Sequence, residues 1–307
     1  MENIYDLIII GSGPAGLSAS IYAARYKLNF LIFGAEPGGQ MNEIYDIENY
    51  PGMTKTTGKE LIQKFLDHIE SFGVAVKHES VAKIEKQDNG FFELETSRGK
   101  YEAKAIILAM GAEYKKMNIP GETEYLGKGV SYCATCDAPF FREKAVGVIG
   151  GGNSAAVVAL EMADYASKVY LIHRELKLSA EPVWLDKIYA NPKIEVIKET
   201  GVIEIKGDKK VEKIVLDKAH NDKTFLETDG VFIEVGTEPG IQLARKIGIE
   251  TDDGNYIKVK EDMSTNIPGV FAAGDITTGS NKFRQVLTAC AEGSIAASSA
   301  YKSLKLK

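Results

Sequence analysis

The chain has 307 residues, 37 basic and 43 acidic side chains, a formal net charge of −6 and three cysteines. This length accommodates two domains, and the absence of a long run of either charge argues against a nucleic-acid partner. The N-terminal apolar run, residues 7–10, is too short for a signal peptide or a membrane span, so we expect a cytoplasmic protein with no membrane partner.

The chain opens on a predicted strand, a glycine-rich loop, a helix and a second strand. Residues 5–10 end in the apolar run 7–10, which suits a parallel strand buried on both faces. An alanine-rich helix then runs to about residue 25, and strand 30–33 is followed by Glu36. The loop between strand and helix consists of Gly11, Ser12, Gly13, Pro14, Ala15 and Gly16. Glycines let the backbone approach a pyrophosphate, the helix N-terminus favours its charge, and the acid accepts from a ribose hydroxyl, so this order predicts dinucleotide binding.

Residues 38–112 are predicted to contain turns, a helix and a small sheet. Gly38, Gly39 and Gln40 begin a glycine- and amide-rich stretch near the expected cofactor site, and residues 48–52 continue it. The amphipathic pattern of residues 57–72 predicts a helix. Strand patterns at 74–76, 81–84 and 91–96 predict an antiparallel meander, and the apolar run 105–112 predicts a buried strand that returns to the first sheet.

Residues 131–137 hold two of the three cysteines, Cys133 and Cys136. Cysteines separated by two residues can close a small disulfide, and its reversible opening stores and passes on two electrons. A zinc site would need two more ligands at fixed spacing, whereas only the distant Cys290 and four scattered histidines remain, so we expect no metal. A structural disulfide would suit a small secreted chain. We therefore interpret the pair as a redox dithiol, and Cys290 as a small buried hydrophobe.

A second unit repeats the order of the first. Strand 145–149, loop 150–155, helix 156–165 and strand 169–172 predict another dinucleotide-type fold. The repeat leaves open whether a nucleotide binds in it.

The remaining segments return the chain to a ligand edge. Strands are predicted at 194–198, 211–216 and 230–235, and a helix opens at about residue 284. The short apolar run before Gly274 ends at Asp275, where ligands of open α/β sheets bind. Asp275 is placed either to meet a cofactor hydroxyl or to cap a helix.

With these motifs in order, the chain resembles the low-molecular-weight thioredoxin reductases over essentially its whole length. The most specific feature is Cys-Ala-Thr-Cys-Asp directly before a second nucleotide-type fold. The resemblance implies an α/β fold with two Rossmann-like domains, each a three-layer ββα arrangement, the second inserted in the first. It places an FAD-binding domain at 1–113 plus 240–307 and a disulfide-redox, NAD(P)-binding-like domain at 114–239, joined by two hinge strands. It also implies a homodimer.

The resemblance implies roles for individual residues. Cys136 is expected to face the flavin, Cys133 to attack the disulfide of thioredoxin, and Asp137 to serve as acid and base for the leaving thiolate. The residues expected to bind FAD are Gly11, Ser12, Gly13, Pro14, Ala15, Gly16, Glu36, Gly39, Gln40, Asn49, Gly274, Asp275, Arg284 and Gln285.

The second loop departs from the pattern of family members that use NADPH. Those members carry an Asp in this loop, a Glu pair on the following helix, and a His-Arg-Arg cluster with another Arg four residues later. The corresponding residues here are Asn153, Val157, Val158, His173, Arg174, Glu175 and Ser179. Only one of three arginines remains, and Glu175 would place a like charge beside a 2'-phosphate, so NADPH is disfavoured.

Two electron donors remain from this pattern. Glu175 ends the second strand of its unit, where an acid could accept from the 2'-hydroxyl of NADH. Alternatively the fold is retained without its nucleotide, and a protein reduces the flavin. A branch of the family takes electrons from reduced ferredoxin, and we expect this donor, with Lys115 and Lys116 as candidates for the basic patch that an acidic ferredoxin requires. A function of another class, a non-enzymatic flavin-bound redox sensor, is the further alternative.

Overall fold

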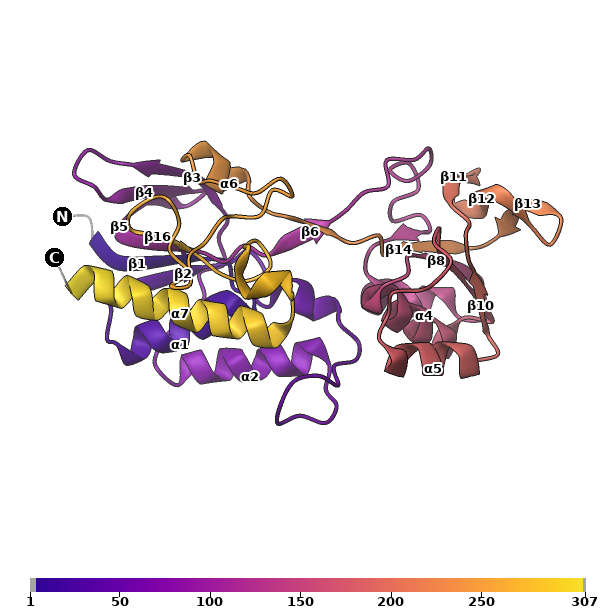
Figure 1. Ribbon diagram of the computed structural model, residues 1–307, viewed down its shortest axis with the longest axis horizontal. Helices are drawn as coiled ribbons and strands as arrows, with labels where there is room; N and C mark the ends of the chain where they lie inside the picture. The colour runs from indigo at the N-terminus through magenta and orange to yellow at the C-terminus, as the bar shows by residue number, and fades with distance from the viewer. Residues whose placement is uncertain (1–3, 306–307) are drawn as a thin grey trace. The chain divides into compact units, whose positions relative to one another are not determined.

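The computed structural model describes residues 4–305, which form two compact units (Figure 1). Unit 1 is built from both ends of the chain, up to Glu113 and from Glu238 onward, and unit 2 comprises Tyr114–Thr237. The second boundary thus lies at 237/238, where the sequence analysis expected 239/240. The chain passes between the units through β6 (Ala112–Tyr114) and β15 (Thr237–Pro239), which pair as a two-stranded sheet.

Unit 1 contains a six-stranded sheet in the order β2-β1-β5-β4-β3, with β16 also paired to β5. The parallel strands are β1 (Ile4–Ile10), β2 (Phe30–Phe33), β5 (Gly99–Leu108) and β16 (Val270–Ala272). The strands β3 (Val81–Lys86) and β4 (Phe92–Thr96) continue antiparallel from β5 and form the predicted meander. The expected strand at 74–76 is absent, because that segment is a connection whose single ladder contact is Lys77 with Phe33.

Alternation along β1 divides the core of unit 1 into two layers. Leu7 and Ile9 face the helices α1 (Pro14–Arg25), α2 (Gly58–Glu70) and α7 (Val286–Lys305), whereas Ile8 and Ile10 pack toward the meander. Figure 1 shows the three helices on one side of the parallel strands and the antiparallel strands β3 and β4 on the other. The short elements are η1 (Gly39–Glu43), α6 (Gln242–Lys246) and η3 (Gly279–Lys282). This is the predicted three-layer arrangement.

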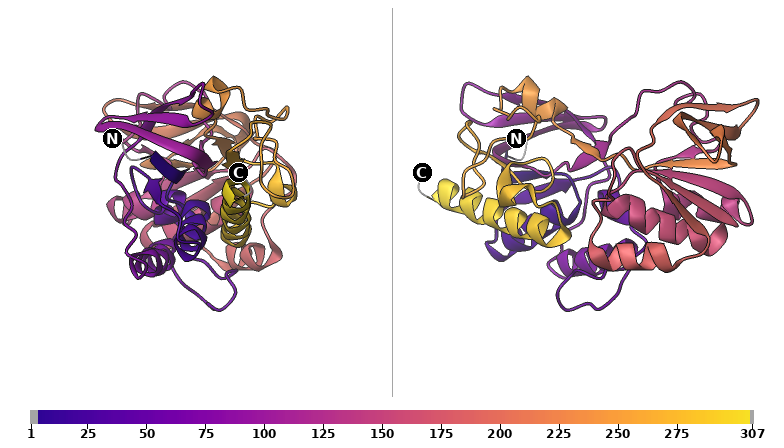
Figure 2. Two further views of the ribbon diagram at one scale, coloured as in Figure 1. Left: turned by 90° about the vertical axis from the view of Figure 1, so that its left-hand side faces the viewer. Right: turned by 45° about the vertical axis from the view of Figure 1, so that its right-hand side comes forward.

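Unit 2 repeats the architecture around a parallel sheet in the order β10-β9-β8-β14-β7. The strands are β7 (Val130–Ser131), β8 (Ala145–Ile149), β9 (Lys168–Ile172), β10 (Ile194–Ile197) and β14 (Gly230–Ile233). One face carries the helices α3 (Ala134–Asp137), η2 (Ala138–Phe141), α4 (Asn153–Tyr165) and α5 (Pro182–Ala190). The other face carries the antiparallel strands β11 (Val202–Gly207), β12 (Val211–His220) and β13 (Lys223–Glu227), as the right-hand view of Figure 2 shows.

The two predicted Rossmann-like folds are therefore both present, the second inserted in the first. In each, a strand leads into a glycine loop and a helix, so the loop lies at the carboxyl edge of the sheet, where ligands of such folds bind. No helix within residues 4–305 has the length and apolarity needed to cross a membrane.

Candidate active site

The two cysteines of the redox segment are joined as a disulfide. The Sγ atoms of Cys133 and Cys136 are 2.03 Å apart and the Cα atoms 5.3 Å apart, within one short helical turn, α3. Cys136 is exposed and Cys133 is partly exposed. Such a small ring can open and close without rearranging the fold around it, which is what a two-electron store requires.

Three hydrogen bonds from backbone N–H groups hold this turn in place. Cys133 is the N-cap of α3, and its Sγ accepts from the backbone N–H of Cys136 at 3.2 Å. The hydroxyl of Ser131, at the end of β7, accepts from the Cys133 N–H at 3.0 Å. The N–H of Asp137 donates to the Cys133 carbonyl at 3.3 Å. The sheet of unit 2 thus positions all three residues that the sequence analysis assigned to catalysis.

Tyr132 ties the redox segment to a buried acid. Its hydroxyl donates to Glu122 Oε1 at 2.5 Å, and Glu122, only 2% exposed, also accepts from the N–H groups of Met117 and Ile119. Burial and the Glu122 carboxylate both raise the pKa of Tyr132. The Tyr132 ring stacks on Tyr114, with centroids 5.8 Å apart. Sequence reasoning missed this network, because no spacing pattern links an isolated Glu to a Tyr ten residues later.

The first glycine loop leaves a helix N-terminus open to a ligand. Gly13 caps α1 without a side chain, and no side-chain cap bond is made there. Gly11 has a φ of +110°, and a Cβ added at Gly16 would lie 1.9 Å from the Gly11 carbonyl oxygen. The Gly38 N–H donates to the Ser12 carbonyl at 2.8 Å, which brings the next loop alongside. The loop therefore forms a narrow backbone cradle suited to a pyrophosphate.

The C-terminal motif of unit 1 places charged groups in a small pocket beside this cradle. Its lining includes Gly274, Asp275, Arg284 and Glu292. Burial is the main cause that raises the pKa of Asp275, the nearby Glu292 charge adds to it, and Arg284 opposes it. The Nε atom of Arg284 is buried and has no hydrogen-bond partner among the described residues. A buried donor without a partner is costly, so this atom is suited to a ligand that accepts from it.

Two lining residues of this pocket, Glu292 and Arg284, are held by further contacts. Glu292 Oε2 on α7 accepts from the Gly274 N–H at 2.8 Å and the Thr277 hydroxyl at 2.9 Å. The Arg284 guanidinium lies 4.0 Å from the centroid of the Tyr256 ring. Sequence reasoning assigned Arg284 and missed Glu292 and Tyr256.

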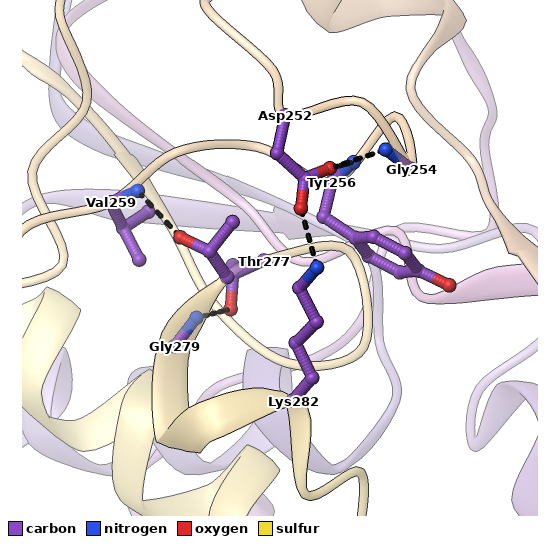
Figure 3. A network of polar contacts seen from close by, with 8 residues as sticks. Asp252, Gly254, Tyr256, Val259, Thr277, Gly279 and Lys282 are labelled. Atoms are coloured by element: carbon purple, nitrogen blue, oxygen red, sulfur yellow. Dashed lines mark hydrogen bonds and ion pairs between the residues drawn. The ribbon is translucent and has the colours of Figure 1, made fainter.

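The loop that carries Tyr256 is itself held by an ion pair, shown in Figure 3. Asp252 Oδ2 contacts Lys282 Nζ at 2.5 Å, and Asp252 Oδ1 accepts from the N–H groups of Gly254 and Tyr256. The residues before Phe283, Ser280 to Lys282, are three consecutive left-handed residues, with φ of 46°, 52° and 58°. Such backbone is disfavoured for non-glycine residues, and the Lys282 contact holds it in place.

The structure brings several other predicted cofactor residues together within unit 1. Asn49 Nδ2 donates to Gln285 Oε1 at 2.9 Å across 236 positions of sequence. Gln40 donates to the Ala112 carbonyl at 2.8 Å. Glu36 is exposed at the end of the β2 region, within 3.4 Å of Asn42 Nδ2. Gly39 is also exposed and has a left-handed φ of +55°.

The second glycine loop has a different surrounding. The Gly151 carbonyl accepts from the backbone N–H groups of Ser179 and Ala180 at 2.7 and 3.1 Å, and Asn153 Oδ1 accepts from the Glu181 N–H at 2.7 Å. A Cβ added at Gly151 would lie 2.4 Å from the His173 ring. These contacts join the loop to His173 and residues 179–181, while the N-cap of α4, Gly152, makes no side-chain cap bond, as is also the case for Gly13 of α1.

Cys290 lies in α7 and is partly buried, with its Sγ 3.8 Å from the Pro14 carbonyl oxygen. Burial raises the pKa of its thiol to about 12, which keeps it protonated and unreactive. No group of three or more potential metal-ligating side chains lies close together within residues 4–305.

Comparison with known proteins identifies the family. Residues 5–293 match the family described as pyridine nucleotide-disulphide oxidoreductase. The chain is 40% identical to the thioredoxin reductase of Bacillus subtilis (strain 168) over 301 residues, 97% of this chain and 94% of that protein. The chain belongs to the thioredoxin reductase family. It is an FAD-dependent disulfide oxidoreductase, as the sequence analysis predicted.

Two solved structures give the same fold assignment. The thioredoxin reductase of Lactococcus lactis (FR conformation) superposes with a TM-score of 0.93 at 40% identity, covering 99% of this chain and 100% of that one. The ferredoxin-flavin thioredoxin reductase of Clostridium acetobutylicum gives a TM-score of 0.55 at 37% identity, with full coverage of both chains.

The residues of unit 1 fit FAD. The side-chain-free N-terminus of α1 suits the pyrophosphate, and the buried, unpartnered Arg284 Nε offers a donor to an acceptor of the cofactor. The partly buried Asp275 carboxylate can accept a hydrogen bond from a hydroxyl of the cofactor. When bound, FAD would supply a redox group that takes electrons from a donor and passes them to the disulfide. The chain's own contribution is to bind the cofactor and to hold a disulfide that can receive two electrons.

Proposed function

We propose that this enzyme carries electrons from reduced ferredoxin through FAD and the Cys133–Cys136 disulfide to thioredoxin. The role of the disulfide is supported by the Cys133–Cys136 bond itself. This bond is closed within one helical turn, which Ser131 at the end of β7 holds in position. Thioredoxin as the substrate is supported by the named activity of the relatives.

We propose roles for Cys133, Cys136 and Asp137 in the order in which the disulfide bonds break and form. Two electrons break the Cys133–Cys136 bond and leave two sulfurs that take up protons. The Cys133 thiolate then attacks the thioredoxin disulfide and forms a mixed disulfide, and Cys136 resolves it, which restores the intramolecular bond and releases reduced thioredoxin. Asp137, directly after Cys136, supplies and accepts the proton of the leaving thiolate.

The proposed roles in FAD binding stay as the sequence analysis assigned them. The loop from Gly11 to Gly16 binds the pyrophosphate, Glu36 the ribose, and Asp275 a further hydroxyl of the cofactor. Gly39, Gln40, Asn49, Gly274, Arg284 and Gln285 complete the site. The support is that, within unit 1, the loop is an open helix N-terminus and Asn49 contacts Gln285.

The surroundings of the second glycine loop support a protein donor over NADPH. His173 packs against Gly151. The backbone N–H groups of residues 179–181 donate hydrogen bonds to the Gly151 carbonyl and the Asn153 side chain. Arg174, the remaining arginine, lies 3.8 Å from Glu175, and both are exposed. A 2'-phosphate there would meet a carboxylate together with a single guanidinium, whereas phosphate recognition favours several fixed arginines.

Ferredoxin is energetically suited to this role. A plant-type ferredoxin and thioredoxin differ by about 130 mV, which is roughly 6 kcal/mol for two electrons in the favourable direction. The relative from Clostridium acetobutylicum is named for this donor. Lys115 and Lys116, exposed directly after β6, are the candidate contacts for an acidic ferredoxin surface.

NADH is the second candidate donor, because Glu175 follows the end of β9, where an acid can accept from a ribose 2'-hydroxyl.

We also propose a homodimer located in the cytoplasm, in line with the family resemblance. Light scattering of the purified protein at micromolar concentration checks the dimer, and a monomer mass contradicts it.

The test is turnover with thioredoxin under anaerobic conditions, with reduced ferredoxin as the sole reductant and new thioredoxin thiols counted. We expect two thiols for every two ferredoxins oxidised. The Cys133→Ser variant should bind FAD as the wild type does and release no thiols. Loss of FAD from that variant, or thiol production by it, contradicts the assignment of Cys133.

A further inference from the structure

A buried carboxyl lies beneath the redox turn and has no part in the mechanism above. Glu161 is on α4, one of the helices that pack against α3, and is 3% exposed. Its Oε2 accepts from the Thr135 hydroxyl at 3.3 Å. Thr135 is one of the two residues between Cys133 and Cys136, so this contact reaches inside the disulfide ring. The cysteine motif and the second nucleotide-type fold are thereby joined by one hydrogen bond.

We propose that Glu161 is a positioning residue of the redox pair, which orients the Cys-Ala-Thr-Cys turn through Thr135 and sets the reactivity of the thiols in the reduced enzyme. The inference deepens the proposed function, because it matters only if the pair is opened during turnover. Glu161 does not enter the electron balance: two electrons still break the S–S bond, and the protons still go to the two sulfurs.

Two physical effects support the role. A hydroxyl between the cysteines loses rotational freedom when a fixed acceptor holds it, which favours one geometry of the turn. In addition, the pKa of Glu161 is raised to about 7, chiefly by burial, with the Thr135 hydrogen bond opposing the shift and the Asp164 charge adding to it. The Glu161 charge therefore changes within the working pH range, and a negative charge hydrogen-bonded to the turn disfavours a second negative charge on the sulfurs of that turn.

The other charged groups of the elements around α4 are largely engaged elsewhere. Lys168 on β9 pairs with Glu195 on β10 at 2.8 Å. Lys187 on α5 lies over the Trp184 ring at 4.4 Å. On α4 itself the neighbouring acid is Asp164. The two further carboxylates on packed elements are Asp137 on α3 and Asp186 on α5. Asp137 belongs to the redox segment, so it supplies the comparison variant.

The test measures thiol reactivity in the reduced enzyme, so it requires neither a donor nor thioredoxin. The purified holoenzyme is reduced chemically without oxygen and treated with iodoacetamide between pH 5 and 9, and mass spectrometry assigns the alkylated cysteine. We expect Glu161→Gln to move the alkylation midpoint to lower pH by about 0.5–1 unit, which is roughly three- to tenfold faster reaction at pH 7.

Threonine variants separate orientation from packing. Thr135→Ser keeps the hydroxyl and should keep the wild-type profile. Thr135→Val keeps the shape but removes the donor, so Glu161 loses charge at a given pH, and the profile should move in the same direction as in Glu161→Gln by a smaller amount. If Glu161→Gln does not fold, the difference between the alkylation profiles of Thr135→Ser and Thr135→Val still tests the role of the Glu161–Thr135 hydrogen bond.

Three results would overturn the inference. The first is a Glu161→Gln profile that superimposes on the wild type. The second is an equal shift for Thr135→Ser and Thr135→Val. The third is a full shift in Asp137→Asn with none in Glu161→Gln, which would assign the effect to Asp137. None of these depends on whether ferredoxin is the donor, so failure here is distinguishable from failure of the proposed function.

Discussion

Arg284 is the residue whose structural state most directly indicates a ligand. Its guanidinium lies over the Tyr256 ring, while its Nε is buried without a partner among the described residues. A buried guanidinium donor without an acceptor costs about 1–3 kcal/mol or more, and a bound cofactor that accepts from it removes this cost.

We therefore predict that Arg284→Met lowers the affinity for FAD at least about tenfold, the equivalent of about 1.4 kcal/mol. The measurement is FAD content after purification, followed by titration monitored through flavin fluorescence. Arg25→Met, an exposed substitution in the last turn of α1, is the matched control and should bind FAD as the wild type does. Equal affinity of Arg284→Met and the control would remove Arg284 from the proposed site.

Residues of the site differ in how far sequence alone could find them. Cys133, Cys136 and the first glycine loop follow from local spacing, since each motif lies within a few positions. Glu161, Glu122 and Glu292 have partners 26, 10 and up to 18 positions away and stand in no motif. Only the fold shows that these acids are buried and bonded, because burial of a single Glu depends on tertiary packing.

At the scale of elements, the first glycine loop and α1 act together, and two glycines in it have different tasks. A Cβ at Gly16 would meet the Gly11 carbonyl oxygen at 1.9 Å, whereas the nearest atom to a Cβ at Gly13 is 3.8 Å away. Gly16 is thus required by the packing of the loop itself. Gly13 has an ordinary φ of −77° and room around it, so the fold alone does not require it.

We predict that Gly16→Ala destabilises unit 1 by several kcal/mol, roughly 2–5, because backbone must move to admit the methyl group. Gly13→Ala should leave thermal stability in the absence of added FAD nearly unchanged. It should weaken FAD binding, since we propose that the pyrophosphate binds at this loop, where the added methyl group would take up space. Thermal unfolding and FAD titration of both variants check this. Unimpaired FAD binding by Gly13→Ala would show that the pyrophosphate does not approach Gly13.

The packing of α4 against α3 gives a prediction for the pH dependence of stability. The pKa of Glu161 is raised from 4.5 to about 7 in the native state, so between these pH values the native state holds a proton that the unfolded chain has lost. Stability conferred by neutral Glu161 is therefore lost as pH rises from about 4.5 to 7.

We predict that the stability of Glu161→Gln relative to wild type increases by roughly 2–3 kcal/mol between pH 5 and pH 8. Trp184, the single tryptophan of the chain, lies in the same core cluster as α4, so its fluorescence reports unfolding of unit 2. Urea unfolding of the oxidised proteins at both pH values is the measurement. A difference that does not change with pH would show that Glu161 titrates normally.

Helices and strands were predictable where the hydrophobic pattern extends over many residues. They were less predictable where tertiary contacts determine whether a segment is a strand or a connection. The strands around both glycine loops and α2 match their patterns, and α2 also carries a capping box between Thr57 and Glu60. The run Val74 to Val76 has strand composition, yet it is a connection, since only Lys77 reaches a neighbouring strand. The short helix α5 carries a proline at its first turn and was not predicted, because nine residues give too little periodic signal.

At the scale of the whole molecule, one chain contains two copies of the same architecture with different surroundings at their glycine loops. The helices after both loops, α1 and α4, begin at a glycine that makes no side-chain cap bond. In unit 1 the buried Nε of Arg284 has no hydrogen-bond partner among the described residues. In unit 2 the loop is packed by His173 and residues 179–181. The duplicated fold was visible in the sequence, but the contacts that distinguish the two loops were not, since their partners lie outside the loop motifs: Arg284 at the far end of the chain, and His173 and residues 179–181 beyond α4.

We propose that the second fold does not receive a nucleotide donor, and anaerobic bleaching of the bound flavin tests this proposal most directly. The yellow holoenzyme is mixed in turn with NADPH, NADH and chemically reduced ferredoxin, and the flavin absorbance is followed. We predict rapid bleaching by ferredoxin and none by either nucleotide at comparable concentration. Rapid bleaching by NADPH or NADH would contradict the account and return a nucleotide to the loop at Gly150 to Ala155.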